Sequence, residues 1–235
     1  HSTTEVALAG GGSVWLRPGE ISLAHRGILF LDELGEFAAN AVDALREPLE
    51  EGVIRLRRAR AAVDLPARFQ LVGAMNPCPC GEGGLDGSCR CSDLARARYS
   101  RRLSAPLLDR FDLAVAVSRP DADLLLRACR GESTATVAER VRAARTIARG
   151  RGVGANAELP SGALDQFAPL SAEAASLLER RLRAGSLSAR GLHRVRRVAR
   201  TIADLDGEGP IVGVQQVAEA LQLRSARGTL GVASG

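Results

Sequence analysis

The sequence contains no lysine, and all 32 of its basic residues are arginine. P-loop nucleotide sites grip phosphate with the motif G-x-x-x-x-G-K-[ST], in which the lysine reaches the β- and γ-phosphates. A chain without lysine cannot carry that motif, so these 235 residues do not hold a complete site of this type. The arginine bias itself is ordinary where genomic base composition favours arginine codons, and it is weak evidence for a nucleic-acid partner.

Aromatic residues are also few: one tryptophan, one tyrosine and five phenylalanines. Stacking of bases on aromatic rings is therefore not the main grip of any nucleic-acid contact. No apolar run approaches the length of about 20 residues that a membrane-spanning helix needs, and no signal peptide is visible. The chain begins with His1 instead of methionine, and we expect a piece of a longer protein that acts in the cytoplasm.

Composition divides the chain near residue 121. Upstream, short apolar runs alternate with turns, which predicts an α/β domain over residues 1–120. Downstream, alanine, arginine, leucine and glutamate dominate and strand formers are few. This pattern predicts an all-α domain over residues 121–228 and a short tail over residues 229–235.

The upstream part contains several predicted elements. The apolar run at residues 27–31 shows no alternation, which predicts a strand buried on both faces of a parallel sheet. Residues 68–74 and 111–117 predict two further strands. Residues 37–51 predict one helix, ended by Gly52. Residues 53–65 predict a hairpin with an arginine-rich tip.

Helices dominate the prediction downstream. Apolar residues recur with a period near 3.6 over residues 134–149, 171–184, 188–205 and 214–223. The third segment is the clearest, because its apolar residues fall on a single stripe.

Two acids, Asp32 and Glu33, directly follow the first predicted strand. Ligands of open α/β sheets bind outside the carboxyl ends of the strands. There, Asp32 would hold Mg²⁺ through water, since Mg²⁺ keeps much of its hydration shell, and Glu33 would polarise an attacking water. The same pair also fits a strand that merely ends in solvated acids.

Two more polar residues follow predicted elements. Asn76 ends the second strand, where its amide can bond a γ-phosphate or orient a water, although asparagine also opens turns before proline. Arg110 lies between Asp109 and Asp112. An arginine offered to the ATP of a neighbouring subunit is worth about 10³–10⁵ in rate. An ion pair with one of the flanking acids in the same chain is the alternative.

Five segments together resemble the ComM/YifB proteins, which are AAA+ relatives of the magnesium-chelatase motor subunit. They lie at residues 24–34, 45–50, 74–81, 106–113 and 187–194. The likeness covers nearly the whole chain, and the cysteine-containing segment AMNPCPCG is highly specific for this branch. It implies an α/β fold: an incomplete AAA+ parallel-sheet core with a pre-sensor-1 β-hairpin, followed by an all-α lid domain.

The resemblance also implies roles for single residues. Asp32 and Glu33 correspond to the Walker B pair, Asn76 to sensor 1, Arg110 to the arginine finger and Arg190 to sensor 2 on the lid. ComM-like proteins are hexameric helicases that promote branch migration during natural transformation. ATP, Mg²⁺, a hexameric ring and DNA are the implied cofactors and partners. A chelatase-like or protein-remodelling motor without DNA, and a non-catalytic interaction module, remain alternatives.

This chain departs from that family in lacking the phosphate loop. Residues 1–13 resemble the segment that follows the loop in the family. We therefore expect the first strand, the loop and the usual N-terminal domain to lie upstream, and this chain alone to bind ATP poorly.

Four arginines gather on the predicted hairpin, which the resemblance places in the pore of the ring over residues 52–65. They are Arg55, Arg57, Arg58 and Arg60. Contact with DNA phosphates would be salt-sensitive and independent of base sequence. A solvated hairpin that charge protects against edge-to-edge aggregation is the alternative.

Four cysteines form two C-x-C pairs separated by a short loop: Cys78, Cys80, Cys89 and Cys91. Four thiolates can close a tetrahedral Zn²⁺ site. The pairs are tighter than the usual C-x₂₋₄-C spacing, so free thiols and redox chemistry stay open beside structural zinc.

Overall fold

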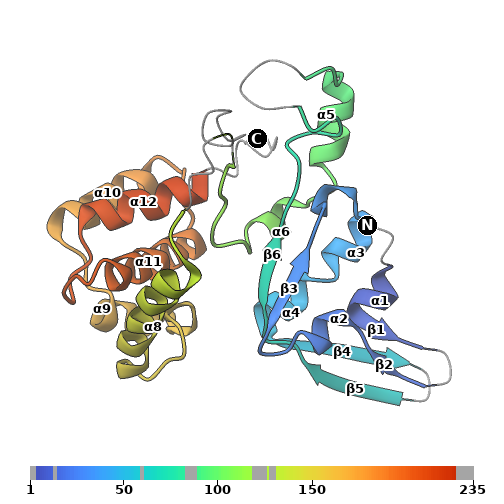
Figure 1. Ribbon diagram of the computed structural model, residues 1–235, viewed down its shortest axis with the longest axis horizontal. Helices are drawn as coiled ribbons and strands as arrows, with labels where there is room; N and C mark the ends of the chain where they lie inside the picture. The colour runs from blue at the N-terminus through green and yellow to red at the C-terminus, as the bar shows by residue number, and fades with distance from the viewer. Residues whose placement is uncertain are drawn as a thin grey trace. The chain divides into compact units, whose positions relative to one another are not determined.

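The computed structural model describes residues 4–12, 15–58, 61–82, 89–117, 126 and 131–225. The chain divides into two compact units, with the boundary between Phe111 and Asp112, whereas the composition shift predicted it between residues 120 and 121. The first unit combines strands with short helices and the second is helical (Figure 1), which confirms the predicted fold class. Among the described helices, none combines the length and the apolar character that crossing a bilayer requires.

The first unit contains a parallel pair of strands, β3 (Ile28–Leu31) and β6 (Gln70–Gly73). Leu31 lies opposite Gly73 at the last position of the ladder. Because the strands run parallel, the chain leaves both of them at the same edge. The segments that follow the two strands are therefore brought together, as the sequence predicted.

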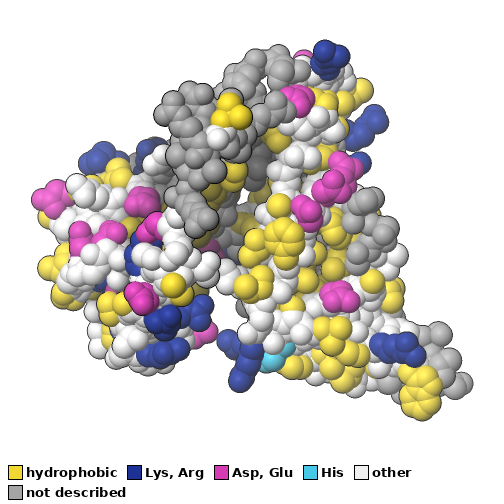
Figure 2. Space-filling model, in the orientation of Figure 1, with side chains coloured by type: hydrophobic (Ala, Val, Ile, Leu, Met, Phe, Trp, Pro, Cys, Tyr) yellow, Lys and Arg dark blue, Asp and Glu magenta, His cyan; other side chains and the backbone are white. Residues whose placement is uncertain are grey.

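The two faces of β3 differ. Leu29 and Leu31 are buried, whereas Ile28 and Phe30 keep 64% and 58% of their surface exposed. Hydrophobic side chains also gather over the first unit on the face drawn in Figure 2. The prediction of a strand buried on both faces is thus wrong for the described part of the chain, because nothing described there packs on the second face.

The buried face of β3 belongs to the apolar core of the first unit, which short helices complete. These are α1 (Glu5–Ala9), α2 (Glu20–Leu23), α3 (Ala39–Asp43) and α4 (Arg46–Glu51). Core side chains come from the helices, their turns and the strands: Leu8, Ile21, Leu29, Leu31, Val42, Leu45 and Ile54. Because Leu29 and Leu31 of β3 pack in this core, the end of the strand is held in place.

The single helix predicted over residues 37–51 is wrong, since α3 and α4 are separate. The cause is Pro48, which has no N–H for the bond to the carbonyl four residues earlier. Helix α4 begins at Arg46, which puts Pro48 in its first turn, where that N–H would have no partner in any case. Gly52 caps α4 with φ 71°, the left-handed conformation that glycine adopts without strain, so its predicted place is confirmed.

An antiparallel hairpin follows, formed by β4 (Val53–Arg58) and β5 (Ala61–Pro66). Ile54 and Leu56 are buried, so one face of the hairpin packs on the core and the other carries its charged residues. The remaining elements of this unit are β1 (Gly10–Gly11), β2 (Arg17–Pro18), the 3₁₀ turn η1 (Leu34–Glu36), α5 (Asp93–Ser100) and α6 (Ala105–Leu108).

The strand predicted over residues 111–117 is wrong, because these residues have no ladder partner in the described chain. Val115 and Val117 are 69% and 91% exposed. The backbone N–H of Ala114 donates instead to the carbonyl of Leu223 at 2.8 Å, so this segment belongs with the second unit.

The second unit confirms the four predicted helices. They are α8 (Thr134–Gly150), α10 (Ala172–Arg183), α11 (Ala189–Leu205) and α12 (Val214–Ser225), with the short turns η2 (Asn156–Glu158), η3 (Ser161–Ala163) and α9 (Leu164–Phe167) between them. Ser133, Ser171 and Ser188 cap α8, α10 and α11 by accepting a backbone N–H three residues further on. Helix α11 contacts α8, α10 and α12, and its apolar stripe supplies Val195, Ala199 and Ile202 to the core.

A charged cluster is buried beside that stripe. Asp204 accepts two bonds of 2.6 Å from the Arg151 guanidinium and one of 2.7 Å from the Asn156 amide. Arg200, which is fully buried, donates from Nε to the same carboxylate at 3.1 Å. Burial acts to raise the pKa of Asp204, but the bonds from Arg151 and Asn156 and the charge on Arg200 outweigh it and hold that pKa below its usual range.

Candidate functional site

The predicted acid pair lies at the edge where the parallel strands end. Asp32 and Glu33 directly follow β3, and both are exposed. Glu33 has φ 51°, in the left-handed region that few residues other than glycine adopt. Its N–H donates to Asp32 Oδ1 at 2.9 Å, and its carbonyl accepts from the N–H of Glu36 at 2.7 Å. A tight turn therefore keeps both carboxylates at the sheet edge.

The predicted amide lies at the same edge. Two backbone bonds extend the pairing beyond the strands: Ala74 N–H donates to the Leu31 carbonyl at 2.9 Å, and Leu34 N–H donates to the Ala74 carbonyl at 2.8 Å. Asn76 follows two residues later and is exposed. The structure thus brings Asp32, Glu33 and Asn76 together on segments that backbone hydrogen bonds join.

Sequence reasoning missed a residue behind this edge. Tyr99 of α5 is 4% exposed, and its hydroxyl donates to the backbone carbonyl of Asn76 at 3.1 Å. Its ring lies so close to Gly35 that a Cβ there would meet Tyr99 Oη at 2.2 Å. Tyr99 is the only tyrosine of the chain, and that is the one signal in the sequence that distinguishes it.

Arg110 follows α6 and is held by its own chain. Its side chain is 10% exposed, pairs with Glu50 of α4, and donates to the Pro106 carbonyl at 2.5 Å. The intrachain alternative named Asp109 or Asp112 as the partner; Glu50, which lies on α4, is a partner that the sequence did not indicate. Any reach towards a neighbouring subunit therefore requires this ion pair to open or to move as a unit.

Arg190 lies in the first turn of α11 and is exposed. It belongs to the second compact unit, unlike the other residues predicted for the nucleotide site. Its assignment to sensor 2 stays a prediction.

The hairpin arginines are engaged with acids of the same unit. Arg55 pairs with Glu47 and, at 2.5 Å, with Glu51. Arg57 pairs with Asp64 across the hairpin at 2.6 Å and lowers the pKa of that carboxyl. The side chains of Arg55 and Arg57 remain 42% and 52% exposed, so both are still accessible to a partner.

The other two arginines predicted to contact DNA are Arg58 and Arg60. Arg58 is the last residue of β4, and Arg60 lies outside the described residues.

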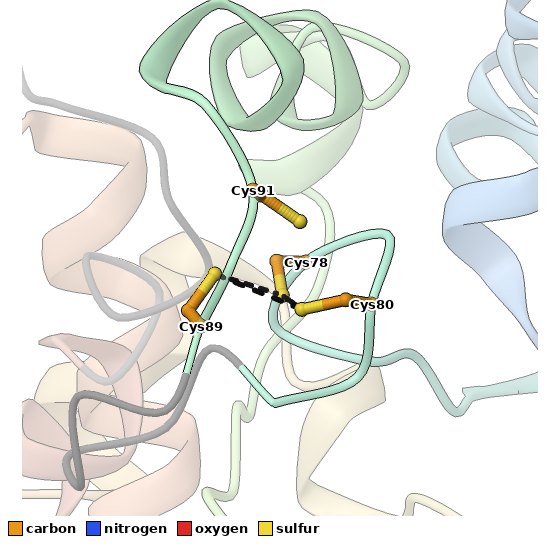
Figure 3. Close-up of side chains that lie close together, drawn as sticks. All are labelled: Cys78, Cys80, Cys89 and Cys91. Carbon is orange, nitrogen blue, oxygen red and sulfur yellow. Dashed lines mark hydrogen bonds between the residues drawn. The ribbon is translucent and has the colours of Figure 1, made fainter.

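The four cysteines converge, as Figure 3 shows. Cys78 and Cys80 come from the loop after β6, and Cys89 and Cys91 from the segment that leads into α5. Their sulfur atoms all lie within 4.8 Å of one another. Cys78 Sγ is 3.2 Å from Cys80 Sγ and 3.6 Å from Cys89 Sγ, and Cys80 Sγ is 3.7 Å from Cys89 Sγ.

Crowding sets the protonation of these thiols. The pKa of Cys80 falls to about 6, chiefly because the Cys78 thiol hydrogen-bonds to it. The pKa of Cys91 rises to about 12, chiefly through its hydrogen bond with Cys80, and burial raises the pKa of Cys78. One thiolate therefore suppresses the ionisation of its neighbours. A divalent cation among the four sulfurs would remove that restriction, because metal binding deprotonates its thiol ligands.

Comparison with protein families gives two matches that cover most of the chain. The family described as magnesium chelatase, subunit ChlI, matches residues 1–125. The family described as the C-terminal part of the same subunit matches residues 131–224.

Individual proteins are similar over almost the whole chain. YifB of Escherichia coli, named an uncharacterized protein, is 47% identical over 226 residues, and the competence protein ComM of Haemophilus influenzae is 46% identical over 226 residues. Each match covers 96% of this chain and 44% of the relative. The magnesium-chelatase 38 kDa subunit of Acidiphilium rubrum is 34% identical over 116 residues, which are 49% of this chain and 27% of that protein. The chain thus spans less than half the length of these relatives.

Proposed function

We propose that this chain is the hydrolytic and lid portion of an ATP-driven ring motor. The chain belongs to the family of the magnesium chelatase subunit ChlI, which is related to AAA+ ATPases. The observation that carries the proposal is the meeting of Asp32, Glu33 and Asn76 at one edge of a parallel sheet. In an open α/β sheet this edge is where ligands bind.

The residues present fit one half of an ATP site. Asp32 would hold Mg²⁺ through water, Glu33 would take a proton from the attacking water, and Asn76 would orient that water beside the γ-phosphate. Bound Mg²⁺ would supply charge neutralisation at the phosphates. The lysine that grips phosphate is not among these 235 residues, so a segment outside them must supply it.

The other half of the site would come from a neighbouring subunit in a ring of six. Arg110 is our candidate for the residue that reaches across, with Arg190 reporting nucleotide state from the helical domain. The ion pair of Arg110 with Glu50 supports a gated version of this role. We infer that the arginine is held by Glu50 until the subunit interface forms.

The test of hydrolysis uses the full-length protein that contains this chain. Glu33→Gln keeps the size of the side chain and removes the base, so kcat for ATP should fall by about 10²–10⁴ while nucleotide binding and ring assembly persist. Glu20→Gln, a change at an exposed glutamate on α2, is the matched control. Normal turnover in the Glu33→Gln protein would refute the assignment of this site.

DNA is the client we propose, with action in the cytoplasm. Arg57 is the best-placed contact, because it lies on the charged face of the hairpin and stays half exposed although it pairs with Asp64. Arg57→Ala should weaken DNA binding and reduce its salt dependence by about one phosphate contact. Asp64→Asn should act in the opposite direction, because it frees the same guanidinium from its carboxylate.

The two hairpin variants also separate the rival clients. If ATPase activity does not respond to DNA at low salt, and neither variant changes DNA affinity, a chelatase-like or protein-remodelling role is favoured. A full-length protein without ATPase activity would favour the interaction module.

We also propose a structural Zn²⁺ at the four cysteines. Zinc–sulfur bonds of about 2.3 Å in a tetrahedron require sulfur–sulfur distances of about 3.8 Å. The separations of 3.6 and 3.7 Å are close to that value, the Cys78–Cys80 separation of 3.2 Å is shorter, and all four sulfurs lie within 4.8 Å of one another. Elemental analysis should find one zinc per chain. The metal should be lost in Cys89→Ser and retained in Cys129→Ser, a change at the fifth cysteine of the chain, which lies outside the two C-x-C pairs. Zinc-free wild-type protein purified under reducing conditions would exclude the site.

A further inference from the structure

Tyr99 contacts both segments of the sheet edge proposed for catalysis: the Asn76 segment and the turn after Glu33. We propose that Tyr99 is a positioning residue, and that the metal-held cysteine loop and Tyr99 together fix Asn76 relative to the turn that carries Asp32 and Glu33. The inference rests on the proposed function for the meaning of that edge. It adds a regulatory link: loss of the metal loosens Asn76 and slows hydrolysis.

The first contact is with the Asn76 segment. The Tyr99 hydroxyl donates to the Asn76 carbonyl at 3.1 Å, so it holds the backbone and leaves the amide side chain available. Gly81, with φ 77°, turns the cysteine loop back towards Asn76, and a Cβ on Gly81 would lie 4.0 Å from the Asn76 Cγ. Asn76 is therefore flanked by the cysteine loop on one side and held by Tyr99 through its carbonyl.

The second contact is with the turn after Glu33. The Tyr99 ring occupies the space that any side chain at residue 35 would need, since a Cβ on Gly35 would lie 2.3 Å from Tyr99 Cζ. Arg102, one turn further along, donates to the Gly35 carbonyl and to the Glu36 carboxylate, both at 2.7 Å. Its guanidinium also lies 5.9 Å from the Tyr99 ring centroid. Tyr99 and Arg102 together hold the turn from behind.

The cysteines anchor both ends of this arrangement. Cys78 comes two residues after Asn76, and Cys91 comes directly before Ser92, the N-cap of α5. A metal bound by all four sulfurs would therefore fasten the helix that carries Tyr99 to the loop that carries Asn76. Without the metal, the Tyr99–Asn76 hydrogen bond and the packing described above would still join the two.

Burial of the ring alone does not account for Tyr99. The ring is buried against Gly35 of η1, and the hydroxyl is directed at the main-chain carbonyl of Asn76. A phenylalanine would fill the same space, so the hydroxyl must be explained by what it bonds.

The experiment on Tyr99 separates position from stability. Tyr99→Phe removes only the hydroxyl. In the full-length protein we expect kcat to fall about 3- to 10-fold, as the loss of one hydrogen bond allows. KM for ATP and the zinc content should not change. Ser100→Ala is the matched control, because its hydroxyl bonds the Ala97 carbonyl within the same helix, and it should keep the wild-type kcat.

Hydrogen exchange on the 235-residue chain tests the metal link without any activity. Removal of zinc should increase exchange at residues 74–76 and 34–36, while residues 195–205 in the second unit keep their rates. In Tyr99→Phe the same two segments should exchange faster even with zinc bound.

Failure of this inference can be told apart from failure of the proposed function. A full-length protein that does not hydrolyse ATP would sink the proposed function, yet exchange would still report whether the metal and Tyr99 hold the edge. Unchanged exchange after zinc removal, or a wild-type kcat in Tyr99→Phe, would overturn the inference.

Discussion

Asp32 and Asp204 are the same amino acid in two opposite settings. Asp32 ends a strand, is exposed, and accepts from the N–H of the next residue. Asp204 is 3% exposed and is bonded by two arginines and an amide. The second unit therefore uses the carboxylate of Asp204 to satisfy buried cations, whereas the first unit leaves Asp32 exposed at the sheet edge.

Under the proposed function, the two aspartates divide stability from chemistry. A buried charge persists only with partners that compensate its lost hydration, and Asp204 has enough of them. An acid that is to hold a metal must keep its oxygens accessible, and Asp32 is exposed at the sheet edge. The backbone turn and Tyr99 then hold the first unit's edge by other means.

The largest difference is expected when the same isosteric change is made at Asp204 and at Asp32. Asp204→Asn removes the charge that two arginines share and should lower the free energy of unfolding of the second unit by about 3–5 kcal/mol. Asp32→Asn should change stability by no more than about 0.5 kcal/mol. Chemical denaturation followed by circular dichroism measures both. Equal losses would show that Asp32 is a structural acid.

A second change compares a packed glycine with an open one. A methyl group at Gly35 would collide with the Tyr99 ring, so Gly35→Ala should destabilise the first unit by about 1–3 kcal/mol. Nothing lies within 4 Å of a Cβ at Gly162. Gly162→Ala should therefore raise stability by up to about 1 kcal/mol or leave it unchanged. Thermal unfolding of both variants would decide it, and a harmless Gly35→Ala would mean that the ring moves aside freely.

Lowering the pH should have a smaller effect, which is confined to the stability of the second unit. The folded pKa of Asp204 is depressed, so its contribution is fully present above the unfolded pKa near 3.9 and is lost as pH falls through the lower folded value. Between pH 7 and 5 this group should not change the melting temperature of the second unit. Below about pH 4 the wild type should lose stability faster than Asp204→Asn, and parallel acid profiles would contradict the assignment.

The sequence predicted the elements that depend on local pattern. The periodicity of α8, α10, α11 and α12 was sufficient because their apolar stripes and serine caps act within a few residues. The sheet edge was predictable as well, since two apolar runs that each end in polar residues must meet if the strands run parallel. What was missed depends on contacts between distant residues.

Three misses share that cause. No residue pattern near Gly35 indicates that the Tyr99 ring packs against it, because the two residues lie far apart in the sequence. The burial of Arg200 was not predicted, because the buried cluster that it forms with Asp204 is completed by Arg151 and Asn156, which lie about 50 residues away in the sequence. Residues 111–117 have the composition of a strand, but a strand also needs a neighbour, and none is available in the described chain.

The left-handed backbone at Glu33 limits which replacements the fold tolerates there. A β-branched residue would add steric strain to a conformation that already costs about 1–3 kcal/mol, whereas glycine would relax the turn. Glycine or asparagine would adopt this backbone conformation at a lower cost than glutamate, and the role proposed for the Glu33 carboxylate accounts for the glutamate found here. We expect the Glu33→Gly protein to have a higher melting temperature than the wild type and no ATPase activity, which would show that stability is given up for activity at this position.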